Sequence, residues 1–167
     1  MESILPNEIT ELAARVIAEN IIAGRTIALA ESCTGGLVAA ALTEIPGSSA
    51  VFGSGYVTYS NDAKIKMLGV NEDILDTFGA VSVAVAWAMA QGALKRSGAD
   101  FAVAISGVAG PGGGTEKKPV GTVVFAVAEK NKDPEDITAD RKDFGSEKSR
   151  AEIRAIAALY ALELLLP

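Results

Sequence analysis

Apolar positions along the chain switch between helical spacing and short continuous runs, and this switching predicts helices that alternate with buried strands. Residues 8–23 repeat apolar side chains at helical spacing, and Gly24 is placed to end that helix. Residues 26–32 (TIALAES) then form a short, partly β-branched apolar run, which is typical of a buried strand. Residues 34–43 return to small side chains that favour a helix.

The rest of the chain continues this alternation. Residues 52–59 (FGSGYVTY) predict a strand whose two glycines indicate a bulge or a close approach of another backbone. The remaining predicted elements are helices at residues 62–68, 72–78, 82–96 and beyond 146, and strands at residues 100–106, 120–129 and 137–144. Residues suited to cap the helices are Asn7, Asn61, Asn71, Ser82 and Ser146.

The order of these elements predicts an α/β fold. Helices alternate with buried strands through most of the chain, and a strand hairpin and a helix close it, so we expect a three-layer α/β/α sandwich with a mixed, mostly parallel sheet. No linker or repeat divides the sequence, so residues 1–167 are predicted to form a single domain. Sites in such folds lie at the carboxyl ends of strands. The glycine-rich corners at 32–36 and 106–115 both follow strands, so they could face each other across one cleft.

Composition narrows the functional classes. The 167 residues carry a net charge of −6 without a basic stripe, so we expect no nucleic-acid partner. The lone Cys33 excludes an internal disulfide and suits a reducing compartment. With no histidine and scattered carboxylates, no metal site is expected. The N-terminus is not a secretory signal and no apolar run spans a membrane, so the predicted location is cytoplasmic.

Ser32 stands at the strand-to-helix corner Ser32-Cys33-Thr34-Gly35-Gly36. Backbone N–H groups at such a corner can bind an oxyanion or a phosphate, and the glycines let a ligand approach the main chain. The simpler interpretation is that Ser32 or Thr34 caps the next helix, which an isolated pattern of this kind favours. A serine acting as nucleophile also needs a base, which here must be Asp, Glu, Lys or Tyr.

Two lysines follow the second predicted strand and are candidate bases. A lysine becomes a base when burial lowers its pKa, and Lys64 or Lys66 in YSNDAKIK could take this role, although most helix lysines are exposed. Tyr59 ends the strand and could point inward with Lys64. Cys33 is a rival nucleophile, but an adjacent side chain in an extended segment points the opposite way from Ser32. We interpret Cys33 as a small buried hydrophobic residue.

The segment GVAGPGGGTEKKPVGT, residues 107–122, resembles a phosphate cradle in composition. It lacks the spacing G-x-x-x-x-G-K-[ST], so it is not a Walker P-loop, and a flexible surface loop explains the composition equally well. Arg150 and Arg154 lie one turn apart near the start of the last helix. One of them could reach a phosphate, although two solvated helix charges are the commoner explanation.

The segments AESCTGGLVAAALTEIPGSSAVFGSGYVTYSNDAKIKMLGV and SGVAGPGGGTEKKPVGTV resemble the CinA C-terminal domain family. Members act as nicotinamide-nucleotide amidases, which convert nicotinamide mononucleotide (NMN) to nicotinate mononucleotide and ammonia. By motif position the resemblance implies that Ser32 is the nucleophile, Lys64 its base and Tyr59 an assisting group. It also implies a substrate site lined by residues Thr34, Gly35, Gly36, Gly112, Gly113, Gly114, Thr115 and Arg150.

The resemblance carries further expectations. Lys148-Ser149-Arg150 stands where the family often has Gly-Asp-Arg, so the arginine is kept and the preceding turn is not. The family implies no cofactor, an NMN substrate and a homo-oligomer, first of all a dimer. Since no pyrophosphatase-like domain precedes these residues, a stand-alone amidase is expected. The alternatives are a non-catalytic nucleotide-binding module and an interaction protein linked to competence or DNA damage.

Overall fold

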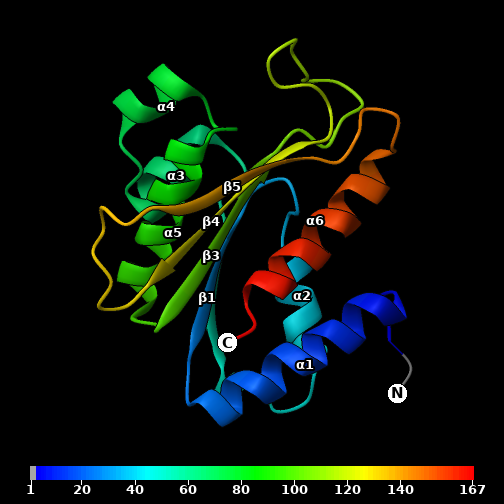
Figure 1. Cartoon of the computed structure of the whole chain (residues 1–167), viewed down its shortest axis with the longest axis vertical. Coiled ribbons are helices and arrows are strands. Elements are labelled where there is room, and N and C mark those ends of the chain that lie inside the picture. The colour runs from blue at the N-terminus through cyan, green and yellow to red at the C-terminus, as the bar shows by residue number, and fades with distance from the viewer. Residues whose placement is uncertain (1–2) are drawn as a thin grey trace.

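Five strands form one sheet in the computed structural model, which describes residues 3–167 (Figure 1). The strands are β1 (Ile27–Glu31), β2 (Phe52–Val57), β3 (Phe101–Gly107), β4 (Thr122–Glu129) and β5 (Thr138–Asp143). The helices are α1 (Asn7–Ala23), α2 (Leu37–Thr43), α3 (Asn61–Leu68), α4 (Glu72–Phe78), α5 (Val83–Ser97) and α6 (Arg150–Leu164), with a short 3₁₀ turn at Ser48–Ala50.

The sheet has the order β2-β1-β3-β4-β5 and is mixed, as the sequence predicts. β1 pairs in parallel with β2 and β3, whereas the β3–β4 and β4–β5 pairs are antiparallel, so the two kinds of pairing divide the sheet evenly. In β2, Gly53 is the extra residue of a bulge, because Ile27 pairs with Phe52 and the next residue, Ala28, pairs with Ser54. The expected bulge is therefore present.

Helices cover both faces of the sheet, which confirms the three-layer sandwich (Figure 1). α1, α2 and α6 share one hydrophobic core, and α3, α4 and α5 share the other. Side chains of β1 alternate between the two, with Leu29 in the first core and Ala28 and Ala30 in the second. Alanines on the second face let α5 lie close to the sheet. On α5, Gly92 has no room for a Cβ against the Leu68 carbonyl, so it permits the close approach of α3.

Of the five predicted helix caps, two are confirmed and three are wrong. Asn71 and Ser82 cap α4 and α5 by accepting hydrogen bonds from backbone amides of the first turn. Asn7 and Asn61 instead lie inside α1 and α3 as their first residues. α3 is capped by Ser60, whose extended backbone lets its hydroxyl accept from the Ala63 amide at 3.0 Å. The Lys64-bearing helix therefore begins one residue earlier than predicted.

The last helix begins three residues later than Ser146 predicts. Ser149 caps α6, and with Glu152 it forms a capping box in which each side chain accepts from the other residue's backbone amide. The prediction of Ser146 as the cap was wrong because Ser149, unlike Ser146, has a glutamate three residues further on, and the capping box with Glu152 starts the helix there. Because serine caps as well as aspartate does, Lys148-Ser149-Arg150 still presents Arg150 from the first turn of the helix.

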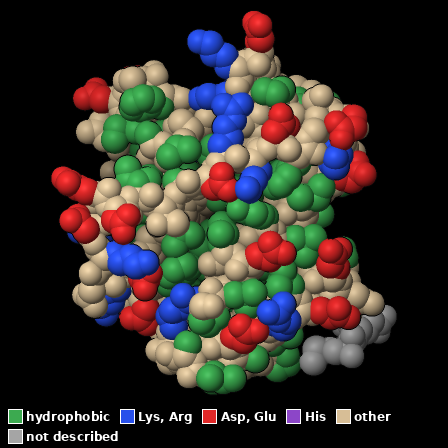
Figure 2. All heavy atoms as spheres, in the orientation of Figure 1, with side chains coloured by type: hydrophobic (Ala, Val, Ile, Leu, Met, Phe, Trp, Pro, Cys, Tyr) green, Lys and Arg blue, Asp and Glu red, His purple; other side chains and the backbone are tan. Residues whose placement is uncertain are grey.

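On the face in view, basic side chains lie together only at the top of the molecule (Figure 2). Over the rest of this face, Lys and Arg are interspersed with Asp and Glu. Among residues 3–167, no helix combines the length and the apolar character that crossing a membrane requires.

Candidate functional site

Ser32 lies at the carboxyl end of β1, directly beside the end of β3. Its backbone amide donates to the Ile105 carbonyl at 2.9 Å, so the main chain is fixed where the strand ends. The alternation of β1 continues past the strand, because Ser32 faces the α3 side while Cys33 packs in the core of α1, α2 and α6. Ser32 is mostly buried, with 8% of its surface exposed.

Lys64 reaches Ser32 from the first turn of α3. The Lys64 Nζ donates to the Ser32 Oγ at 3.1 Å and to the Thr58 carbonyl at 2.8 Å. Only 1% of the residue's surface is exposed, which makes it one of the largest fully buried side chains in the described part of the chain. The same 3.1 Å separation suits a hydrogen bond from the Ser32 hydroxyl to Lys64 once the amine is neutral.

The environment of Lys64 favours the neutral amine. Burial lowers the pKa of the Lys64 ammonium below its ordinary value of 10.5, and the nearby Cys33 offsets this only in part. Among the ion pairs of residues 3–167, none involves Lys64. Burial also raises the pKa of the Cys33 thiol to about 11, so at neutral pH this residue has almost no thiolate. Ser32, not Cys33, is the side chain that contacts the Lys64 amine.

Because of this burial, the stability of the fold should depend on pH through Lys64. Between the lowered pKa of folded Lys64 and its ordinary value of 10.5, the unfolded chain binds a proton that the folded chain does not. The free energy of unfolding therefore rises with pH in this window, by at most about 1.4 kcal/mol per pH unit. In Lys64→Met this rise should be absent when urea unfolding is measured at a series of pH values.

Lys66 provides the matched control for that measurement. It lies on the same helix, but its side chain is 72% exposed and pairs with Asp62 at 2.9 Å. Lys66→Met should therefore keep the wild-type dependence on pH. If the curves of wild type and Lys64→Met stay parallel up to pH 10.5, folding does not alter the pKa of Lys64.

Tyr59 and Arg150 form the outer wall of the same site. Arg150 donates from Nη2 to the Tyr59 hydroxyl at 2.8 Å and from Nη1 to the Gly110 carbonyl at 2.7 Å. One guanidinium thus ties the start of α6 to the chain after β2 and to the glycine loop after β3. These three segments meet at the carboxyl edge of the parallel strands, which is where the fold predicts a site.

A cavity of about 180 Å³ lies between these groups. It is lined by Ser32, Lys64, Tyr59, Val81, Ser106 and Arg150, together with neighbouring residues. Ser106 was not predicted as a site residue. Its hydroxyl is buried and donates to the Ala80 carbonyl at 2.8 Å. A serine at the end of the strand next to Ser32 was the sequence signal that could have identified it.

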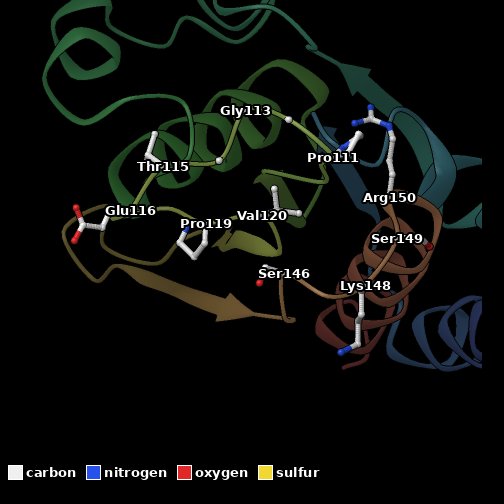
Figure 3. Close-up of a pocket in the computed structure, with 12 residues that line it drawn as sticks. Pro111, Gly113, Thr115, Glu116, Pro119, Val120, Ser146, Lys148, Ser149 and Arg150 are labelled. Carbon is white, nitrogen blue, oxygen red and sulfur yellow. The ribbon is translucent and has the colours of Figure 1, made fainter.

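The tip of the glycine loop lines a second, neighbouring hollow of about 500 Å³ (Figure 3). The glycine-loop side of it includes Gly112, Gly113, Gly114 and Thr115, and the other side is formed by Ser146, Lys148, Ser149 and Arg150. The expected single cleft is thus two adjoining spaces, and Arg150 lines both. Lys148 also borders the second hollow, but its side chain extends away from the glycine loop in Figure 3.

The structure does not bring Thr34, Gly35 and Gly36 into either space. Thr34 is fully buried, and its carbonyl accepts from the Arg154 guanidinium at 2.9 Å. The amide of Gly36 donates to the Glu31 carboxylate, as do two further amides at the start of α2. The N-terminus of α2 is therefore filled from within the protein. It is not open to an external phosphate, and the residue that caps it is neither Ser32 nor Thr34.

Glu31 is the main residue that sequence reasoning missed. An acidic side chain at the end of an apolar strand was the available signal, because a buried carboxylate must find hydrogen-bond donors.

As for metals, residues 3–167 contain no group of three or more Cys, Asp or Glu side chains that could hold an ion.

Comparisons with known proteins agree on one family. A family model described as the CinA C-terminal domain matches residues 9–167. The solved structure of competence/damage inducible protein CihA from Agrobacterium tumefaciens has a TM-score of 0.92 and 51% identity, and the match covers 98% of this chain and 97% of that one. A CinA superfamily protein from Klebsiella pneumoniae has a TM-score of 0.87 and 38% identity, with 94% of each chain covered.

The curated relatives are longer proteins. A CinA-like protein from Mycolicibacterium gilvum is 64% identical over 108 residues, which are 65% of this chain and 26% of that relative. A CinA-like protein from Parasynechococcus marenigrum is 46% identical over 154 residues, which are 92% of this chain and 36% of that relative. The chain thus spans about a quarter to a third of the length of such relatives, and it aligns with one part of them.

Proposed function

The chain belongs to the CinA C-terminal domain family, and on this premise we propose that it is an amidase that hydrolyses the carboxamide of NMN. The products are nicotinate mononucleotide and ammonia. The observation that carries the proposal is the buried contact of 3.1 Å between the Lys64 Nζ and the Ser32 Oγ. In a chain without histidine, a lysine whose pKa is lowered by burial is the base that can activate a serine.

The proposed reaction has two steps. Ser32 Oγ attacks the carboxamide carbon while neutral Lys64 takes the hydroxyl proton, and the C–N bond then breaks as Lys64 returns that proton to the leaving ammonia. The substrate is left as an ester on Ser32. A water molecule, deprotonated by Lys64, attacks this ester, and the ester bond breaks to give the carboxylate and to restore the Ser32 hydroxyl. One water is consumed and one ammonia is released in each cycle.

The sizes of the two spaces support a substrate that extends through both. Pockets that hold a whole drug-sized ligand measure about 300–1,000 Å³. The cavity at Ser32 has about 180 Å³, which suits a pyridine ring with its carboxamide and leaves no room for a whole nucleotide. We therefore propose that the ribose phosphate extends past Arg150 into the glycine-loop hollow, which has about 500 Å³. Arg150 and the backbone amides of Gly112–Gly114 are the groups there that suit an anion.

Ammonia release from NMN by the purified protein tests this function. We expect turnover with NMN and weaker turnover with nicotinamide riboside, which lacks the phosphate. We also expect full activity in EDTA, because no set of side chains within residues 3–167 suits a metal. Binding of NMN without ammonia release would favour the alternative of a non-catalytic nucleotide-binding module. Loss of turnover in EDTA that a divalent ion restores would show that a metal site is present.

A further inference from the structure

Glu31 is a buried carboxylate directly before the proposed nucleophile. It is 1% exposed, and its side chain points to the α2 side of the sheet, away from Ser32. Oε2 accepts from the amides of Gly36 at 3.0 Å and Val38 at 3.2 Å, and Oε1 accepts from the Ala39 amide at 2.8 Å. These bonds close residues 31–39 into a fixed turn, and Ser32 lies inside it.

The main chain of Glu31 is joined to the proposed base as well. Its carbonyl accepts from the Thr58 amide at 2.9 Å, and the carbonyl of Thr58 accepts from the Lys64 Nζ at 2.8 Å. Ser32 follows Glu31 through one peptide bond. Glu31 therefore supports both Ser32 and Lys64. It holds Ser32 through the turn, and it holds Lys64 through the backbone pairing with Thr58.

The position of Glu31 also keeps its charge away from Lys64. A carboxylate in contact with Lys64 would favour the ammonium form and would work against the base. Instead the carboxylate lies on the α2 face and Lys64 lies on the α3 face, with the sheet between them. The charge of Glu31 is taken up by the three amides and by the positive end of α2. The buried acid can thus fix the turn without pairing with the base.

From this arrangement we infer that Glu31 is a positioning residue that holds the Ser32 hydroxyl in line with Lys64. The inference rests on the proposed amidase function for its kinetic part. It does not rest on the substrate, because the orientation of Ser32 also decides how fast a serine-directed reagent reacts with it.

Glu31→Gln tests the inference with little change in volume. A glutamine amide nitrogen cannot accept, so at least one amide at the start of α2 loses its acceptor and the turn shifts. We expect kcat for NMN to fall about 100-fold with KM unchanged, as a small misplacement of a catalytic group would produce. The rate at which a fluorophosphonate modifies Ser32, followed by mass spectrometry, should fall in parallel. In that modification the Ser32 oxygen bonds to phosphorus, its hydroxyl proton passes to Lys64, and the P–F bond breaks to release fluoride.

Asp100→Asn is the matched control. Asp100 also supports β1 with a carboxylate, accepting from the Thr26 amide at 2.9 Å and the Thr26 hydroxyl at 2.8 Å, but at the opposite end of the strand. Asp100→Asn should lower the melting temperature and leave kcat and Ser32 modification unchanged. Should Glu31→Gln not fold, Glu31→Asp keeps the charge with a shorter reach and should show the same losses to a smaller degree.

The outcomes separate the inference from the function on which it rests. Glu31 variants that melt earlier but keep the wild-type rate of Ser32 modification would overturn the positioning role. If wild-type protein is modified at Ser32 and releases no ammonia from NMN, the amidase proposal fails, and the modification rates still decide the role of Glu31. A wild-type protein whose Ser32 does not react at all would overturn both.

Discussion

Ser32→Ala should abolish ammonia release from NMN, and Lys64→Ala should do the same. In the proposed reaction, the first substitution removes the atom that attacks the carboxamide, and the second removes the group 3.1 Å away that takes its proton. In serine hydrolases, loss of either partner costs about 10⁴- to 10⁶-fold in kcat. We expect losses of at least the lower figure here, measured as ammonia released by equal amounts of folded protein.

Because the proposed mechanism needs both residues in the same step, the double variant should be little worse than either single one. Lys64→Arg should not restore activity, since a guanidinium stays protonated and cannot act as a base. The controls are Cys33→Ala and Lys66→Ala. Cys33 also borders the Ser32 cavity, but its side chain packs in the core of α1, α2 and α6, and Lys66 is exposed, so both variants should retain substantial turnover. If Cys33→Ala were inactive and Ser32→Ala active, the nucleophile would be Cys33 and not Ser32.

The proposed roles of Ser32 and Lys64 also predict how activity changes with pH. Lys64 must be neutral to accept the proton of Ser32, so kcat/KM should rise with pH through the lowered pKa of Lys64 and then level off. A rate that falls over this range would mean that the protonated amine is the required form, and it would contradict the role of Lys64 as base.

Most of the fold follows from local pattern. The period of apolar positions placed every helix and strand, and glycines that end helices, such as Gly24 and Gly98, have the left-handed backbone that the sequence implies. The errors lie at helix starts, where several serines and asparagines compete. The Ser149–Glu152 capping box was visible in the sequence, and it would have placed the start of α6 correctly.

The sequence also contains a local pattern that distinguishes Lys64 from Lys66. Lys64 and Leu68 lie one helical turn apart and are the buried residues of α3, whereas Lys66 falls on the outer face. Helical spacing alone therefore favours Lys64 as the lysine that points inward. What spacing could not supply is its partner, because the contact with Ser32 joins positions 32 residues apart.

The substrate side of the site was harder to predict. Thr34, Gly35 and Gly36 suggested a backbone anion site, but Glu31 fills the start of α2, and a carboxylate that satisfies neighbouring amides leaves no separate sequence motif. The glycine loop lines the expected hollow. The separation of this hollow from the Ser32 cavity depends on Arg150, which bonds both the Tyr59 hydroxyl and the Gly110 carbonyl. Such bonds are tertiary contacts that no local pattern encodes.

Arg150→Met should lower kcat/KM for NMN about 100-fold, chiefly through a higher KM. The guanidinium lines both spaces and holds the Tyr59 hydroxyl and the Gly110 carbonyl, so its loss removes a candidate phosphate ligand and loosens the wall between them. Hydrogen bonds to charged groups contribute about 1.5–3 kcal/mol each, which sets this magnitude. The loss should be smaller for nicotinamide riboside, because that substrate has no phosphate to bind.

Arg141→Met is the control for loosening of the loop alone. Arg141 donates to the Lys117 carbonyl at 2.6 Å and so also ties down the segment after β3, but it lines neither space. Its substitution should leave kcat/KM for NMN near the wild-type value. Equal losses in both arginine variants would mean that Arg150 acts only by tethering the loop. If Arg150→Met lowers kcat/KM equally for NMN and for nicotinamide riboside, the phosphate of NMN does not bind beside Arg150.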